Sequence, residues 1–256
     1  MNEDYQRFIV SAKSASNMRK QKRTDNKVAI VTASGRGIGA GIARELHAKG
    51  YKLALLSPSG TAERLGKDLD SFGITGSVTH KKDLERLVSK TISTYCRIDA
   101  VVNHTGHSPK GELLKIADKD WMLGMEMMFL NVVRMARLVT PIMIKQGKGA
   151  IVNITTWATF EPDISVPISC SMRSALACFT KMYADIHAGY GIRMNNVLPG
   201  GTDSLPEREE LLNRIPMRRY GSVAEISKTV AFLLSDDAGY ITGQNIRVDG
   251  GVTRHV

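Results

Sequence analysis

Buried-strand patterns and helical patterns alternate along this chain from residue 27 to its end, and this alternation constrains the fold more than any other feature. Short apolar runs are typical of buried parallel strands, whereas apolar residues recurring every three or four positions indicate helices. The predicted strands are Lys27–Thr32, Lys52–Leu56, Ile74–Thr79, Asp99–Asn103, Gly149–Ile154, Ile192–Leu198 and Gln244–Val248. Such alternation requires a parallel sheet, because right-handed crossovers place the intervening helices on both of its faces. We therefore predict an α/β fold with one doubly wound parallel sheet of about seven strands and helices on both faces.

The chain divides into a short arm and one domain. No repeat or linker interrupts the alternation over residues 27–256, so this stretch is predicted to be a single domain. Residues 1–26 lack periodicity and are basic in their second half, which we interpret as a flexible, solvated N-terminal arm. A transit peptide is the weaker interpretation, because Glu3 and Asp4 lie where such peptides avoid acidic residues.

Composition narrows the class of protein. With 43% hydrophobic and 23% charged residues the chain is a globular protein, and no apolar run approaches the roughly 18 residues of a membrane span. Three cysteines suggest free thiols in a reducing compartment, so we expect a cytoplasmic protein. The net charge of +10 favours an anionic partner: a phosphorylated cofactor, an acyl-carrier surface or nucleic acid. Basic and aromatic residues are not interleaved, so we expect no nucleic-acid partner.

Glycines follow the first predicted strand at the point where a helix begins. Gly35, Gly37 and Gly39 lie between Lys27–Thr32 and a helical stretch that ends at Gly50. Backbone N–H groups in such a loop can approach a pyrophosphate, and the helix N-terminus favours the anion. A tight turn without a ligand is the alternative interpretation. The combination of strand, glycines and helix predicts a Rossmann-type nucleotide-binding domain.

Several segments resemble the short-chain dehydrogenase/reductase family. Thr32–Gly39 is similar to that family's Thr-Gly-x-x-x-Gly-x-Gly loop, and Asn103–Gly106 to its Asn-Asn-Ala-Gly motif. Asn195–Gly200 resembles the stretch that leads to its Pro-Gly turn, and the C-terminal segment from Phe232 to Gly251 is also similar. The resemblance runs from about residue 27 to the end and is nearest to the 3-oxoacyl-carrier-protein reductase-like branch. It implies a nicotinamide dinucleotide bound by Thr32, Ser34, Gly35, Arg36, Gly37, Ile38, Gly39, Ser57, Asn103, Gly106, Arg173, Pro199 and Gly200.

The chain departs from the family at the positions that carry its catalytic chemistry. Alignment on the motifs places Ser169 at the family's tyrosine and Arg173 at its lysine. Thr156 stands at the catalytic serine, and Met128 at the helical asparagine. A serine hydroxyl is a far weaker acid than a phenol, and losing a positioned general acid typically costs about 10²–10⁴ in rate. Thr156, Ser169 and Arg173 are therefore the candidate catalytic residues of an atypical site.

Two histidines are a candidate proton source. His104 and His107 follow the fourth predicted strand, at the carboxyl edge where such sheets bind ligands, and imidazole titrates near pH 6.5. The alternative is that His104 replaces a structural asparagine and His107 is a solvated loop residue. No third ligand accompanies the pair, so no metal site is predicted.

The cofactor side also departs from the family pattern. Ser57 stands where many NAD-dependent members carry an acid, so a 2′-phosphate is not repelled, and Arg36 in the glycine loop can pair with it. This favours NADP over NAD. Ser77 replaces an aspartate that contacts adenine. Ala33 replaces the first loop glycine, which is tolerable if its φ is negative.

These features leave three interpretations open. The first is an NADP(H)-linked oxidoreductase acting on a small-molecule or acyl substrate with a carbonyl or hydroxyl group. The second is a catalytically inactive nucleotide-binding or scaffolding relative, and the third is a partner-binding protein that uses the basic arm. Five methionines of the long helical stretch Asp118–Ile144 suit adaptable packing. In the family this helix lines a dimer interface, which implies a homodimer or homotetramer.

Overall fold

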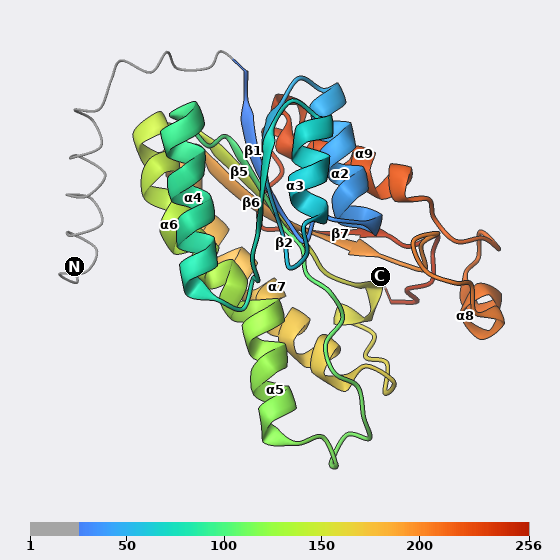
Figure 1. Ribbon diagram of the computed structural model, residues 1–256. Coiled ribbons are helices and arrows are strands. Elements are labelled where there is room, and N and C mark those ends of the chain that lie inside the picture. The colour runs from blue at the N-terminus through green and yellow to red at the C-terminus, as the bar shows by residue number, and fades with distance from the viewer. Residues whose placement is uncertain (1–25, 256) are drawn as a thin grey trace.

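A single seven-stranded sheet forms the centre of the protein (Figure 1). A computed structural model describes residues 26–255, so residues 1–25, nearly all of the predicted arm, lie outside the described residues. All strand pairs are parallel, in the order β3-β2-β1-β4-β5-β6-β7. The strands are β1 (Val28–Thr32), β2 (Lys52–Ser57), β3 (Phe72–Thr75), β4 (Ala100–Asn103), β5 (Gly149–Ile154), β6 (Ile192–Pro199) and β7 (Asn245–Val248). The predicted doubly wound α/β fold is confirmed.

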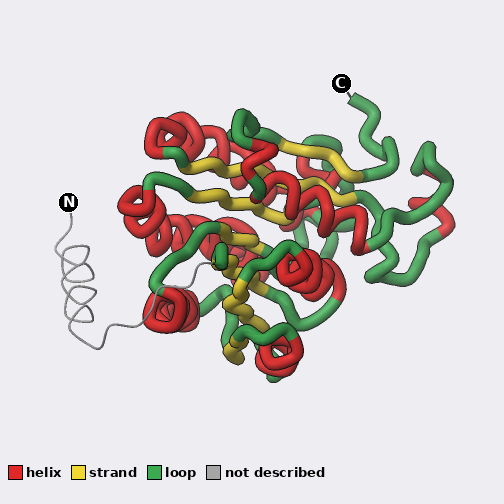
Figure 2. The backbone as a smooth tube through the Cα atoms, turned by 90° about the horizontal axis from the view of Figure 1, so that it is seen from above, coloured by secondary structure: helices red, strands yellow, loops and turns green. Residues whose placement is uncertain are grey.

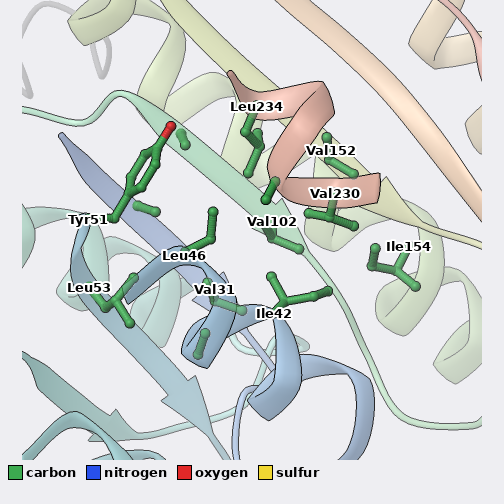
Figure 3. Close-up of a cluster of buried hydrophobic side chains, with 14 of the residues drawn as sticks. Val31, Ile42, Leu46, Tyr51, Leu53, Val102, Val152, Ile154, Val230 and Leu234 are labelled. Carbon is green, nitrogen blue, oxygen red and sulfur yellow. The ribbon is translucent and has the colours of Figure 1, made fainter. Parts of the chain in front are cut away.

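Helices cover both faces of this sheet, as Figures 1 and 2 show. One face carries α2 (Gly37–Ala48), α3 (Thr61–Asp68) and α9 (Val223–Leu234), and the other carries α4 (Lys81–Tyr95), α6 (Asn131–Gln146) and α7 (Pro167–His187). Each face has its own apolar core. Figure 3 shows the first of them, where Ile42 and Leu46 of α2 and Val230 of α9 pack on Val31, Val102 and Val152 of the strands.

A long helical rod runs over residues Asp118–Gln146. It consists of α5 (Asp118–Met125), a π-helical turn η2 (Glu126–Leu130) and α6. By length and composition this rod is apolar enough to cross a membrane, although the sequence contains no long uninterrupted apolar run. Yet 44% of its most apolar window is buried inside the protein, with Met135, Val139 and Met143 in the second core. Packing against the sheet accounts for its apolar character.

The third strand begins earlier than predicted. The sequence pattern predicts Ile74–Thr79, but β3 spans Phe72–Thr75. A Cβ on Gly73 would lie 2.0 Å from the carbonyl oxygen of Ala62, so α3 approaches this strand at a position that only glycine permits. Contact with α3, which no pattern within the strand reveals, fixes where β3 lies.

The order of the strands creates a crevice at the carboxyl edge of the sheet. The connections reverse direction between β1 and β4, and open α/β sheets bind ligands at such a switch point. A short helix, α8 (Glu209–Arg214), lies in the segment after β6. Its Leu211 and the neighbouring Ile215 pack with Trp157 in a third, small core. Three segments distant in sequence, the ends of β1, β4 and β5, therefore border one site.

Candidate active site

The glycine loop joins β1 to α2 at the switch point. Ala33 has a φ of 48°, so it lies in the left-handed region, and the negative φ under which alanine would be tolerated without strain is not adopted. The reason is local: a Cβ on Gly39 would come within 2.2 Å of the Ala33 carbonyl oxygen, so the loop folds tightly against the first turn of α2. The family's glycine at this position is replaced here by a residue under backbone strain.

The N-terminus of α2 is open to an anion. Its N-cap residue, Arg36, makes no side-chain capping hydrogen bond, and the first turn contains no acidic residue. The side chain of Arg36 is exposed. Free N–H groups, the helix field and a guanidinium together suit a phosphate group, so the residues present fit a dinucleotide.

One neighbour of this loop escaped the sequence analysis. Ser204 lies over the loop, with its Cβ 3.3 Å from where a Cβ on Gly37 would stand, and Gly37 itself has a φ of 52°. The hydroxyls of Ser204 and Thr202 are 2.7 Å apart. The only signal in the sequence was their place shortly after Pro199 and Gly200, which end β6 and begin the loop at the same edge of the sheet.

Four predicted cofactor-binding side chains make their hydrogen bonds inside the protein. Thr32 Oγ1 donates to the His104 carbonyl at 2.7 Å and accepts from the His104 N–H at 2.9 Å, which joins the ends of β1 and β4. Ser34 Oγ donates to the Leu56 carbonyl at 3.3 Å. These side chains shape the loop that a ligand would contact, rather than extending into the crevice.

Ser57 and Asn103 are engaged in the same way. The hydroxyl of Ser57 donates to the Ser59 carbonyl at 2.6 Å and accepts from the Ala62 N–H at 3.1 Å, so it ties the turn after β2 to α3. Asn103 Nδ2 donates to Asn153 Oδ1 at 2.9 Å within the sheet. Of the other predicted positions, Gly35 and Ile38 are half-buried, and Gly106 is exposed at the edge.

Ser169 and Arg173 face each other across one turn of α7. Arg173 Nε donates to Ser169 Oγ at 3.1 Å, and its Nη1 donates to the Ile154 carbonyl at the end of β5, at 2.5 Å. Arg173 is only 8% exposed, and burial lowers the pKa of its guanidinium to about 10. Because Ser169 accepts from Arg173, its own proton remains free to be donated to a ligand.

The other positions aligned with the family's catalytic residues differ in what they offer. Thr156 follows β5 and is half-buried, and its hydroxyl accepts from the Ala158 N–H at 3.4 Å. Met128 is buried in the π-helical turn and offers no strong hydrogen-bonding group. Tyr183 lies further along α7 and is engaged elsewhere, because its hydroxyl is buried 2.6 Å from that of Thr140.

The two histidines carry lowered pKa values. Burial, with the charges of Arg173 and His107, lowers the pKa of His104 to about 3, so its imidazole is neutral at neutral pH. Burial also lowers the pKa of His107, helped by Lys110, Arg173 and Arg36. As neutral imidazoles, His104 and His107 can relay a proton from one ring nitrogen to the other, but they do not carry an extra proton that they could donate. Within residues 26–255 no three His, Cys, Asp or Glu side chains gather as a metal site would require.

A buried amide beside the site was also missed. Among the described residues, only His104 Nδ1 and Asn131 Oδ1 are buried side-chain polar atoms without a hydrogen-bond partner. Asn131 begins α6, directly after the turn that contains Met128. Alignment with the family shows that Met128 replaces an asparagine. It does not show that the amide of Asn131, three residues further on, is buried without a partner.

A groove lies between α8 and the loop after β5. Its volume is about 380 Å³, and its walls include Asp163 and Ile164 on one side and Arg208, Leu211 and Arg214 on the other. The Arg214 guanidinium stacks over the Trp157 ring at 4.9 Å. The segment Ser204–Pro216, which corresponds to the mobile substrate lid of the family that the chain resembles, therefore borders this groove through Arg208, Leu211 and Arg214.

Comparison with known proteins agrees with this geometry. A family model described as enoyl-(acyl carrier protein) reductase matches residues 32–253. The 3-oxoacyl-[acyl-carrier-protein] reductase of Staphylococcus epidermidis is 31% identical over 242 residues, which cover 89% of this chain and 99% of the relative. The corresponding reductase of Thermotoga maritima is 31% identical over 245 residues, 90% of this chain and 99% of the relative. The chain belongs to the short-chain dehydrogenase/reductase family.

Within this family the chain lies in the branch of the 3-oxoacyl-carrier-protein reductases. The resemblance stated from the sequence is thereby confirmed, both in family and in branch. The roles of the individual site residues remain predictions.

Proposed function

We propose that this protein is an NADP(H)-linked oxidoreductase acting on a carbonyl or hydroxyl substrate through an atypical site built on Thr156, Ser169 and Arg173. The observation that carries the proposal is the Arg173 Nε–Ser169 Oγ hydrogen bond of 3.1 Å, which keeps a donor hydroxyl and a cation together where the family has its tyrosine and lysine. The open N-terminus of α2 supports binding of the dinucleotide.

The groups after β2 support NADP over NAD. Ser57 is uncharged, and the nearest acid of α3, Glu63, accepts from the N–H and hydroxyl of Thr75 at 3.1 and 3.0 Å. Glu63 is thus bound to Thr75 in the first turn of α3, no acid stands at Ser57 itself, and the exposed Arg36 attracts a 2′-phosphate.

In this mechanism the protein's own residues bind and polarise the substrate oxygen. When bound, NADP(H) supplies or removes the hydride. Ser169 and Thr156 donate hydrogen bonds to the oxygen, and the nearby guanidinium of Arg173 stabilises the negative charge that develops on it. His104 and His107 are neutral relays by which a proton reaches this oxygen.

A binding protein without turnover is the second candidate. The observation in its favour is that Tyr183, the one tyrosine of α7, has its hydroxyl buried against Thr140, so it offers no phenol to the site. Binding alone needs only the glycine loop.

Separate measurements of binding and turnover test these candidates. We expect nicotinamide fluorescence titration to give a lower Kd for NADPH than for NADH. Arg36→Ala should weaken NADPH binding about tenfold or more and leave NADH nearly unchanged, since one charge-assisted hydrogen bond is lost. Slow NADPH oxidation with carbonyl substrates supports the enzyme, tight binding without turnover favours the binding protein, and equal or reversed affinities contradict the choice of NADP.

A further inference from the structure

Arg173 is a buried cation that no carboxylate balances within residues 26–255. Its guanidinium is desolvated, and the only other group that shifts its pKa is the neighbouring thiol of Cys170. A buried charge without a counterion is costly, and proteins normally pair such a charge or neutralise it. The position therefore calls for an anion that comes from outside the chain.

The guanidinium is held so that one nitrogen remains available. Nε is bonded to Ser169 Oγ and Nη1 to the Ile154 carbonyl, which fixes the plane of the group. Nη2 has no hydrogen-bond partner among the described residues. A fixed guanidinium with a free N–H group is suited to donate a hydrogen bond to one oxygen of a carboxylate.

The surroundings of Arg173 are basic. The charged groups that lower the pKa of His104 are Arg173 and His107, those that lower the pKa of His107 are Lys110, Arg173 and Arg36, and none of them is acidic. His104 Nδ1 is in addition a buried nitrogen without a partner. The positive potential and this second unsatisfied atom point independently to an anionic, hydrogen-bonding ligand.

We propose that Arg173 receives a carboxylate of the substrate, so that the substrate is a free oxo acid or hydroxy acid rather than an uncharged ketone or a thioester. This rests on the proposed function, because it names the substrate class of the same site. Since Arg173 is hydrogen-bonded to Ser169, the reacting carbonyl and the carboxylate are only a few bonds apart, as in short-chain oxo acids.

A phosphate of the dinucleotide is the other possible source of an anion. The open N-terminus of α2 and Arg36 already provide for phosphate groups at the glycine loop. Arg173, by contrast, lies on α7 beside the hydroxyl that replaces the family's proton donor. Its place next to the reacting oxygen favours the substrate as the source.

Titration calorimetry with acetoacetate and its uncharged methyl ester tests the proposal. The protein is saturated with NADP⁺, which cannot react with an oxo acid, so binding is measured without turnover. We expect acetoacetate to bind the wild type at least tenfold more tightly than methyl acetoacetate. Arg173→Met should abolish this preference, Arg173→Lys should retain part of it, and Arg137→Met, at an exposed position of α6, should leave it unchanged.

Removing an unpaired buried charge should leave the fold intact, and the comparison of acid with ester in the wild type needs no variant. Equal affinities for acid and ester, or an unchanged preference in Arg173→Met, would overturn the proposal. So would binding of acetoacetate only to cofactor-free protein in competition with NADP⁺, because the anion site would then belong to the cofactor. If NADP⁺ fails to bind while acetoacetate still binds through Arg173, the anion site stands and the proposed function fails.

Discussion

Ala33 carries strain at the place where the nucleotide is expected to bind. A non-glycine residue in the left-handed region costs about 1–2 kcal/mol, and Ala33 has a φ of 48°. Its side chain does not offset this cost by packing, because it is half-buried and lies outside the three apolar clusters. The family's glycine would adopt this conformation freely.

Ala33→Gly should therefore raise the free energy of unfolding by about 0.5–1 kcal/mol, the relieved strain less the added entropy of the unfolded chain. Urea denaturation measures the change. Ala175→Gly, at an exposed position in the middle of α7, is the matched control and should lower stability by about 1 kcal/mol. A loss of stability in both variants would contradict the assignment of strain.

Ser169 limits the chemistry if the protein reduces carbonyl groups. Ser169→Tyr with Arg173→Lys restores the family's pair, and we expect turnover of a 3-oxoacyl substrate to rise by about tenfold or more, since one positioned general acid is regained. Ser169→Phe with Arg173→Lys adds the ring without the hydroxyl and should give no gain. Equal rates in the wild type and the tyrosine variant would mean that another group, such as His104 or His107, already supplies the proton.

Sequence alignment located the predicted site residues along the chain better than it predicted their contacts. It placed Ser169, Arg173 and Arg36 correctly on α7 and at the start of α2, because motif spacing fixes positions along helices. It could not reveal that the side chains of Ser57 and Asn103 form hydrogen bonds with other groups of the protein, or that Ser204 lies over Gly37. Those contacts join segments far apart in sequence, and only the folded chain brings them together.

At the scale of elements, a row of asparagines crosses four neighbouring strands. Asn103, Asn153, Asn196 and Asn245 are paired in register along β4, β5, β6 and β7. Each Nδ2 donates to the next Oδ1 at 2.8–2.9 Å, and Asn196 also accepts from Thr180 of α7 at 2.9 Å. Because the row begins at the residue before His104, it fixes the edge of the sheet that borders the site.

Asn196→Val should lower the free energy of unfolding by about 2–4 kcal/mol, because Asn153, Thr180 and Asn245 all lose a partner in or beside the core. Asn245→Val, at the partly exposed end of the row, removes a single acceptor and should cost less than half as much. Urea denaturation compares the two. Equal losses would mean that the asparagines act separately rather than as one network.

The pattern of apolar residues predicted most strands and helices, but it predicted where they begin and end less well. Strands that are buried along their whole length, such as β1 and β5, were predicted to within one residue, since a run of apolar residues marks them clearly. β3 was misplaced because it is short and half-buried, and its position depends on contact with α3. The π-helical turn within the long rod leaves no signature in the spacing of apolar residues.

At the scale of the whole molecule, the outer surface formed by α5 and α7 retains apolar side chains that the domain does not bury. On α5 these are Met122 and Leu123, and on α7, which packs beside α5, they are Met182 and Ile186. The predicted adaptable methionines thus divide: Met128 and Met135 belong to the interior, whereas Met122 is exposed. Apolar surface on two adjacent helices is typical of an interface between subunits.

We predict that two copies pair through this face about a two-fold axis, as a dimer or as half of a tetramer. Light scattering should then report at least two copies per particle at micromolar concentration. Ile186→Asp introduces a charge at a side chain that is 66% exposed in the single chain, so it should weaken assembly without unfolding the domain. Thr94→Asp, on the exposed side of α4, adds the same charge elsewhere and should leave the assembly intact. A wild-type protein that scatters as a single chain would contradict the prediction, as would an Ile186→Asp variant that assembles as tightly as Thr94→Asp.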